Sequence, residues 1–421
     1  MRLLTTHHGD DTLVWHQGQA ISRAAFSDAA RQLSARLPEA SHCINLCNGR
    51  LSFMLGFVAA ALREQVTLLP PNQTATALTQ LQAKYPCTHV LDDDCLNGLD
   101  LHRATEQTLE TDAERVIAIL FTSGSTGTPQ PQAKSWHTLA HTAALDAARF
   151  ANGAVVNLLA TVPSQHMFGL QTTVMLPLLS RCAIVDSKPF YPADIRAALN
   201  ATPAPRALII TPTHLRACIV SNIDLPELQF ILCATAPLPL ALAQQAEARW
   251  HTQVLEIYGS TEAGTIATRR STAGDAWQLL PGAHLQPTTD GTLLHAPHLT
   301  TALPLSDQVE LLSANEFRLL GRSSEHLKVA GKRASLGELN HALLQIPDVT
   351  DGVIFMPTDA TRTAALVVST LSAAQIFDAL AQRIDPVFLP RPLLIVQRLP
   401  RNDVGKLTQA ALQAALPRSL T

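Results

Sequence analysis

Short apolar runs alternate with stretches of helical periodicity from residue 12 to residue 258. Residues 12–36 read as a strand, a turn at Gly18, a second strand and an amphipathic helix. Further helices are predicted over 54–62 and about 75–84, and another begins near Trp136. The other apolar runs have the length of strands and are found at residues 43–47, 66–69, 88–91, 116–121, 155–160, 183–185, 207–210, 230–233 and 254–258.

The alternation of strands and helices at crossover length predicts a parallel sheet that is covered by helices on both faces. After Gly264 the helical periodicity fades, and short segments such as 292–295 indicate a β-rich region. Residues 323–421 form a smaller α+β unit, with helices near 336–345 and 373–384.

We therefore expect an α/β protein with two domains. The N-terminal domain, 1–322, combines parallel sheets and helices with a small β-rich subdomain, and the C-terminal domain, 323–421, is a small α+β domain. The boundary is placed at residues 322–324. A chain of 421 residues, 47% of them hydrophobic, is long enough to bury a core in each domain.

The charge balance gives no sign of an anionic partner. Asp and Glu number 34 against 31 Lys and Arg, a net charge of -3, so neither nucleic acid nor an anionic membrane is expected to bind. The longest apolar stretch, 51–62, is too short to span a bilayer, and residues 1–8 lack the apolar core of a signal peptide. We expect a soluble, cytoplasmic protein without a transmembrane segment.

The seven cysteines include no CxxC pair, and their odd number predicts free thiols rather than a disulfide framework. Cys43 and Cys47 lack a second pair of ligands, so no zinc site is expected there.

A loop of small residues follows the predicted strand 116–121. Glycines let backbone N–H groups approach an anion closely, and hydroxyls add further donors, so such a loop suits the phosphates of a nucleotide. It is neither a Walker A loop nor a G-x-S-x-G elbow. By composition alone, such a loop is an ordinary turn in about half of all cases. Its place directly after a buried strand favours a functional role. The candidate phosphate-binding residues are Thr122, Ser123, Gly124, Ser125, Thr126 and Gly127.

A second candidate segment ends the predicted strand 254–258, and open α/β sheets bind ligands at such strand ends. Tyr258 offers a ring on which a base can stack, and Glu262 offers a hard oxygen ligand for Mg²⁺. The candidate nucleotide-binding residues of this segment are Tyr258, Gly259, Ser260 and Thr261.

These two segments resemble signatures of the adenylate-forming superfamily, which includes acyl-CoA synthetases, peptide-synthetase adenylation domains and luciferases. Residues 121–129 look like its phosphate-binding signature, and 258–262 look like its adenine and Mg²⁺ motif. The resemblance covers nearly the whole chain, because further motifs follow in the right order.

Four further segments of residues 1–322 carry the resemblance. Residues 163–169 match the segment whose histidine, His166, lies near the acyl carboxylate. Asp307 aligns with the aspartate that binds the ribose diol, and Arg322 with the arginine at the domain junction. The loop that packs against adenine is matched by Ala234, Thr235 and Ala236.

The last hundred residues resemble the mobile C-terminal domain of the superfamily. Residues 328–333 and 337–339 resemble its first motif, and 402–407 resemble its last. The resemblance makes Lys406 the adenylation lysine, whose ammonium bridges the attacking carboxylate and the α-phosphate.

This chain departs from the superfamily pattern in three places. The phosphate loop usually continues Pro-Lys-Gly, but Gln130 follows Pro129 here, so either Lys134 substitutes or the loop lacks that charge. Ser324 stands where the hinge acid is usual, and Gln409 where an arginine is common.

The resemblance implies ATP-dependent activation of a carboxylic acid, an aryl acid such as a hydroxybenzoate or a fatty acid, to acyl-AMP. Lys406, His166 and Glu262 are the implied catalytic residues, with Glu262 as the Mg²⁺ ligand. The acyl group then passes to coenzyme A or to the phosphopantetheine of a separate acyl carrier protein. The loop ending in Lys134-Ser135-Trp136 is similar to that of the stand-alone ligases of aryl-polyene and xanthomonadin pathways.

The alternative is a non-catalytic relative that binds nucleotide or an acyl-carrier partner, which Gln130, Ser324 and Gln409 favour. A kinase of another fold is disfavoured, because its signatures are missing.

Overall fold

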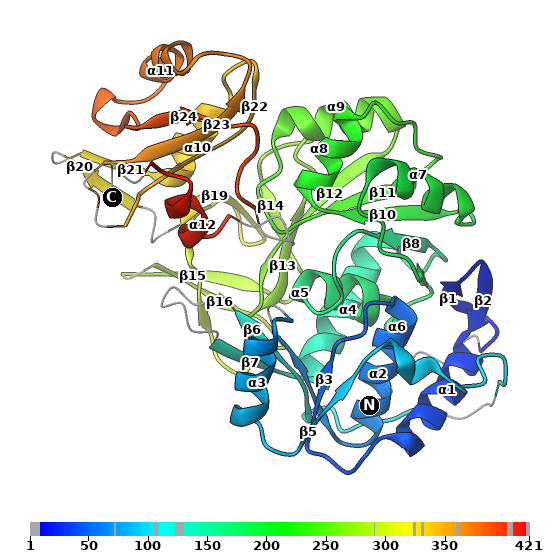
Figure 1. Cartoon of the computed structure of the whole chain (residues 1–421). Helices are drawn as coiled ribbons and strands as arrows, with labels where there is room; N and C mark the ends of the chain where they lie inside the picture. The colour runs from blue at the N-terminus through cyan, green and yellow to red at the C-terminus, as the bar shows by residue number, and fades with distance from the viewer. Residues whose placement is uncertain are drawn as a thin grey trace. The chain divides into compact units, whose positions relative to one another are not determined.

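The computed structural model describes residues 9–70, 73–104, 108–122, 130–289, 291–322, 326–329, 332–358, 360, 362–401 and 407–417 (Figure 1). The chain divides into two compact units, here called the N-terminal and the C-terminal unit. The N-terminal unit comprises 1–274, 280–282 and 297–300, and the C-terminal unit comprises 275–279, 283–296 and 301–421. The domain boundary at 322–324 stays a prediction, and 323–325 lie outside the described residues.

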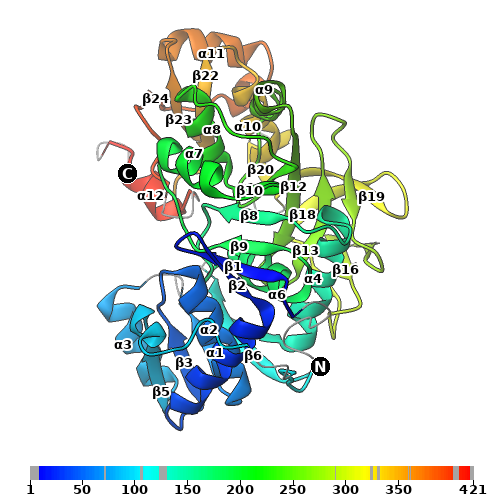
Figure 2. The ribbon, with the colours of Figure 1, turned by 90° about the vertical axis from the view of Figure 1, so that its right-hand side faces the viewer.

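The larger sheet of the N-terminal unit has its strands in the order β13-β12-β11-β10-β8-β9-β1-β2. Adjacent strands from β12 to β1 are parallel, whereas β13 and β2 are antiparallel to their neighbours. Figure 2 shows β10, β8, β9 and β1 one below the other, in their order in the sheet. Their bounds are β1 (Thr12–His16), β2 (Gln19–Ser22), β8 (Asn157–Ala160), β9 (Ala183–Val185), β10 (Arg206–Ile210), β11 (Phe230–Cys233), β12 (Gln253–Ser260) and β13 (Gly264–Arg269).

The second sheet of this unit has the order β5-β3-β4-β6-β7. The strands β3, β4, β5 and β6 pair in parallel, and β7 is an antiparallel edge strand on β6. Their bounds are β3 (His42–Asn45), β4 (Val66–Leu69), β5 (Thr88–Leu91), β6 (Val116–Thr122) and β7 (Gln130–Ser135).

Helices cover both sheets of the N-terminal unit and bury three clusters of apolar side chains. The largest cluster joins residues of both sheets and includes Phe26, Phe53 and Trp136, so the helices that carry them pack in the layer between the sheets. A second cluster lies under α7, α8 and α9, and a third under α3. The helices are α1 (Arg23–Arg36), α2 (Arg50–Leu62), α3 (Ala75–Lys84), η1 (Asp93–Leu96), α4 (Trp136–Phe150), α5 (Met167–Gly169), η2 (Leu170–Met175), α6 (Leu176–Leu179), α7 (Pro192–Ala201), α8 (Pro212–Val220) and α9 (Leu240–Trp250).

The described part of the C-terminal unit is built from short, mainly antiparallel strands and short helices. One apolar cluster packs α10 and α11 on the sheet β22-β23-β24, and another packs α12 against it. The elements are β14 (Trp277–Leu279), β15 (His284–Thr288), β16 (Gly291–His295), β17 (Leu303–Pro304), β18 (Asp307–Leu311), β19 (Glu316–Arg322), β20 (His326–Val329), β21 (Lys332–Ser335), α10 (Leu336–Leu344), β22 (Val349–Phe355), β23 (Ala364–Ser369), α11 (Ala373–Ala381), η4 (Pro386–Phe388), β24 (Leu393–Ile395) and α12 (Gln409–Ala414).

The predicted fold class, an α/β protein with parallel sheets, a β-rich region and a smaller α+β part, is confirmed. The sequence pattern did not predict β7. Its residues are mostly polar, and Pro131 lies within it, a composition that is tolerated only in an edge strand. No helix among the described residues has both the length and the apolar character that crossing a bilayer requires.

Candidate active site

Three of the segments singled out from the sequence lie at one edge of the larger sheet. The strands β8, β11 and β12 run in the same direction, because β10 pairs in parallel with β8 and β11, and β11 with β12. The segment 163–169 begins three residues after β8, and residues 234–236 directly follow β11. Residues 258–262 span the end of β12, at Ser260, and the turn that follows it. The carboxyl ends of parallel strands share an edge, which is where open α/β sheets bind ligands.

The loop after β11 contains a strained residue with an unused polar group. Thr235 has a φ of 81°, which is rare for a β-branched side chain. Its hydroxyl is buried and has no hydrogen-bond partner among the described residues. A buried polar atom normally has a partner, so the fold leaves one hydrogen-bonding group of this loop unused. Ala234 is buried beside it, and Ala236 is half-buried.

The turn between β12 and β13 requires both of its glycines. A Cβ at Gly259 would lie 2.2 Å from the carbonyl oxygen of Gly264, and Gly264 itself has a φ of +73°. Within the turn, the backbone N–H of Ala263 donates to Oγ of Ser260 over 3.1 Å. The sequence Gly-Ser-Thr-Glu-Ala-Gly therefore forms a tight hairpin turn that carries Glu262, with its side chain half-buried.

Two side chains hold the carbonyls of this turn. Nζ of Lys134, on β7, donates to the carbonyl oxygen of Glu262, and Nε2 of His298 donates to that of Ala263 over 2.8 Å. Burial lowers the pKa of Lys134 to about 8 and also lowers the pKa of His298. Lys134 thus bonds the turn that carries Glu262. His298 was missed in the sequence because it lies in none of the motifs.

The segment after β8 is held by a fully buried arginine. The guanidinium of Arg50 donates to the carbonyl oxygens of Ala160 and Val162, over 2.6 and 3.0 Å, and to Oγ of Ser164 over 3.2 Å. His166, half-buried, then occupies the N-cap of α5. The backbone of the segment passes so close to Gly169 that a Cβ there would lie 1.8 Å from the carbonyl oxygen of Pro163. The Pro-to-Gly spacing of this motif is therefore a packing requirement.

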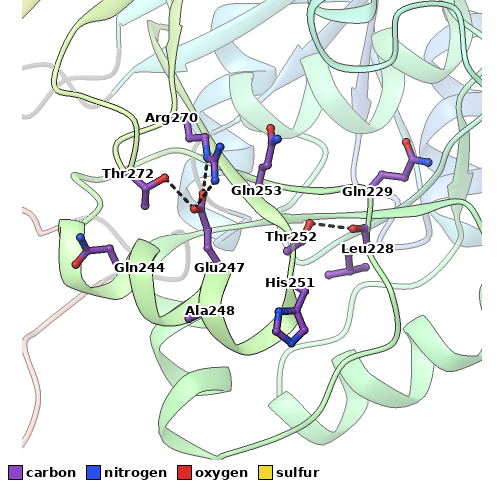
Figure 3. Close-up of a pocket in the computed structure, with 10 residues that line it drawn as sticks. All are labelled: Leu228, Gln229, Gln244, Glu247, Ala248, His251, Thr252, Gln253, Arg270 and Thr272. Atoms are coloured by element: carbon purple, nitrogen blue, oxygen red, sulfur yellow. Dashed lines mark hydrogen bonds and ion pairs between the residues drawn. The ribbon is translucent and has the colours of Figure 1, made fainter.

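Two ion pairs fix the far end of the β12–β13 hairpin. Across the strands, the guanidinium of Arg269 donates two hydrogen bonds of 3.0 Å to the carboxylate of Glu256. Burial raises the pKa of Glu256, and the charge of Arg269 limits the rise. In a hollow at the amino end of β12, Glu247 accepts bonds from both Arg270 and Thr272 (Figure 3). These ion pairs stabilise the end of the hairpin that lies opposite to the turn with Glu262.

A buried carboxyl group lies behind β13. Oδ2 of Asp146, on α4, accepts from the Thr265 hydroxyl over 3.1 Å, and Gln171 of η2 also faces it. Burial raises the pKa of Asp146 to about 7, and hydrogen bonds from Thr265 and Gln171 limit the rise.

The remaining candidate residues belong to the C-terminal unit or lie outside the described residues. Asp307 and Arg322 are directly paired across β18 and β19, so the backbone places these two predicted ribose ligands side by side. The segments 123–129 and 402–406 lie outside the described residues, so nothing is stated for the phosphate loop beyond the β6 strand residue Thr122, nor for Lys406.

All seven cysteines are free, as expected, although the sulfurs of Cys47 and Cys95 lie 4.0 Å apart. No cluster of His, Cys, Asp or Glu suited to a metal ion occurs within the described ranges.

The family model described as AMP-binding enzyme matches residues 7–294, and the chain belongs to this family. The chain is 34% identical over 242 residues to the 4-coumarate–CoA ligase of Rhodobacter capsulatus, a match that covers 56% of this chain and 60% of the relative. It is 29% identical over 296 residues to the 4-coumarate–CoA ligase of Halorhodospira halophila, covering 68% and 73% of the two chains.

The fold is also found in the o-succinylbenzoate CoA synthetase of Bacillus subtilis, solved in complex with an acyl-adenylate. The TM-score is 0.82 at 18% sequence identity, over 98% of this chain and 97% of the other. This similarity confirms the adenylate-forming fold that the motifs predicted.

Proposed function

We propose that this protein is an AMP-forming acid–thiol ligase: it converts a carboxylic acid and ATP to acyl-AMP and pyrophosphate, and then transfers the acyl group to a thiol. The observation that carries the proposal is the gathering of 163–169, 234–236 and the Glu262 turn at one edge of a parallel sheet, in a chain of the AMP-binding family.

Within the N-terminal unit, the roles follow from the groups at this edge. Tyr258 supports the adenine by stacking, and the loop 234–236 packs against it. Glu262 supplies the protein oxygen for Mg²⁺, which neutralises phosphate charge when it is bound. His166 lies near the carboxylate of the acid. The hydroxyl and backbone donors of 122–127 bind the phosphates.

The C-terminal unit completes the proposed machinery. Asp307 accepts hydrogen bonds from the two ribose hydroxyls, since one carboxylate can hold both, and Arg322 lies beside it in register. Lys406 bridges the acid and the α-phosphate during the first reaction. We propose that the C-terminal domain, 323–421, then turns about residues 322–324, withdraws Lys406 and admits the thiol.

Coenzyme A is the proposed acceptor and an aryl acid the proposed substrate, because two of the relatives are named 4-coumarate–CoA ligases. A fatty acid is the competing substrate class, and a separate acyl carrier protein is the competing acceptor. The fatty acid is supported by the similarity to the medium-chain fatty-acid–CoA ligase of Escherichia coli, which is 25% identical to this chain over 367 residues.

A non-catalytic relative that binds nucleotide without turnover is the second candidate. One contact favours it: Nε2 of Gln409, which stands where an arginine is common, donates to the carbonyl oxygen of Met356 over 2.6 Å. Gln409 is thus used to anchor the start of α12.

The test is ATP–pyrophosphate exchange with a panel of hydroxybenzoates, hydroxycinnamates, fatty acids and amino acids. Exchange with one class of acid, abolished by Lys406→Ala, is the expected result, and thioester formation with coenzyme A or a carrier protein then identifies the acceptor. ATP binding without exchange for any acid would refute adenylation and favour the non-catalytic relative.

A further inference from the structure

Two consecutive peptide carbonyls in the β12–β13 turn accept hydrogen bonds from buried nitrogen donors. Lys134 donates to the oxygen of Glu262 and His298 to that of Ala263. The two side chains reach the turn from separate parts of the chain, β7 and the segment 297–300, and they are only 3% and 6% exposed. Both side chains therefore donate their hydrogen bonds within the protein interior and not to solvent.

Burying such groups carries a cost that packing alone does not explain. Removing an amine from water is unfavourable, and Lys134 is nevertheless almost fully buried, with its amine bonded to a peptide oxygen. Nδ1 of His298 and Nε2 of the neighbouring His141 are both buried without a hydrogen-bond partner among the described residues. The imidazole of His298 is thus held through Nε2 alone, and an apolar side chain of similar size would fill either position at lower cost.

These hydrogen bonds fix the two peptide units that flank Ala263, the residue after Glu262. The peptide unit between Glu262 and Ala263 is held at its oxygen by Lys134 and at its N–H by Ser260. The next peptide unit is held at its oxygen by His298. These two peptide units flank Ala263, so the backbone of Ala263 and the carbonyl side of Glu262 are held in one orientation, which limits the positions that the Glu262 carboxylate can reach.

We propose that Lys134 and His298 are positioning residues that hold the Glu262 turn in the orientation needed to present its carboxylate to a nucleotide-bound divalent cation. The identity of that ligand rests on the proposed function. Lys134 also belongs to the β6–β7 hairpin, whose connecting residues 123–129 are the predicted phosphate loop, so one amine ties together the hairpins that carry two nucleotide motifs.

Hydrogen–deuterium exchange of the ligand-free protein tests the positioning directly. We compare the peptide 258–266 in Lys134→Met and His298→Met, which keep side-chain bulk but remove the donor. Each should speed exchange in this peptide about tenfold, the effect of losing one buried hydrogen bond. His298→Gln keeps an N–H near the position of Nε2 and should retain the slow exchange. Lys84→Met, at an exposed position of α3, is the matched control.

Unchanged exchange in both methionine variants would overturn the proposal, as would equally fast exchange in His298→Gln and His298→Met. Where a methionine variant unfolds, the same peptide is measured in Lys134→Arg and His298→Gln, which retain a donor and should exchange more slowly than any donor-free variant that folds.

The consequence for the ligand is measured by calorimetric titration with ATP at varied Mg²⁺. Lys134→Met and His298→Met should raise the Mg²⁺ concentration needed for half-maximal ATP binding about tenfold, and should change metal-free AMP affinity much less. An equal loss of affinity for AMP and for Mg²⁺-ATP would refute the proposal that the two residues help Glu262 to bind the cation. Failure of wild-type pyrophosphate exchange would refute the proposed function alone, because the hydrogen-exchange comparison needs no reaction.

Discussion

Replacing Asp146 with asparagine should stabilise the protein, and more so at higher pH. The carboxyl group is fully buried behind β13, and burial raises its pKa from 3.8 to about 7. An acid whose pKa is raised in the folded state stabilises the fold fully below its unfolded pKa, and this contribution is lost as the pH rises through the folded value. Above pH 7 the folded protein must hold a buried anion, whose nearest cationic influence is Arg149.

The size of the effect follows from the pKa difference. One pH unit corresponds to about 1.4 kcal/mol, so the raised pKa costs the fold about 4 kcal/mol at pH 8, where the buried group is ionised. At pH 5 the cost is about 1–2 kcal/mol, because the folded protein keeps a proton that the unfolded chain releases. Asp146→Asn keeps an oxygen that can accept from Thr265 and adds an N–H₂ facing Gln171, whose Oε1 has no partner among the described residues. The gain in unfolding free energy over wild type should therefore grow by about 2–3 kcal/mol between these pH values.

The assay is urea unfolding followed by tryptophan fluorescence. Three of the four tryptophans, Trp15, Trp136 and Trp250, belong to the N-terminal unit, so the signal reports on the unit that contains Asp146. Glu227→Gln, which removes an exposed carboxylate, is the control and should show little difference between the two pH values. A gain for Asp146→Asn that is the same at both pH values, or a loss of stability at pH 8, would refute the reasoning.

Two further variants probe the hairpin that carries Glu262. Gly259→Ala would place a Cβ 2.2 Å from a carbonyl oxygen, so we expect a loss of about 2–3 kcal/mol in urea unfolding and loss of ATP–pyrophosphate exchange, whereas Gly274→Ala, with open space around it, should change neither. Arg269→Met leaves Glu256, only 4% exposed, without its partner, and should cost about 3–5 kcal/mol in the same unfolding experiment. Adding Glu256→Gln should recover much of that loss; no recovery would contradict the assignment to an unpaired charge.

Most strands and helices of the fold could be predicted from the sequence, because each has a clear local signal. The runs at 116–121 and 230–233 are apolar throughout, as expected for strands that are covered on both faces, and the helix from Trp136 has an amphipathic pattern. The strand β7 gave no such signal, since an edge strand needs no apolar face, and Pro131 argued against it.

The individual segments of the candidate site could be predicted from the sequence, but the contacts between them could not. Glycine, hydroxyl and carboxylate residues at strand ends mark ligand segments, because the turn chemistry is local: Gly259 and Gly264 are required by the close approach within one hairpin. The same local reasoning could not tell whether Lys134 replaces the missing loop lysine, since its bond goes to Glu262, 128 residues away in the sequence.

The sequence by itself determined the alternation of strands and helices, the positions of the ligand motifs and the family resemblance, all of which depend on neighbouring residues or fixed spacing. Only the tertiary structure decided which groups are buried together: Lys134 and His298 on consecutive carbonyls, Arg50 on the segment before His166, and Asp146 behind β13. These contacts depend on desolvation and on the pairing of distant segments, and residue order alone encodes neither.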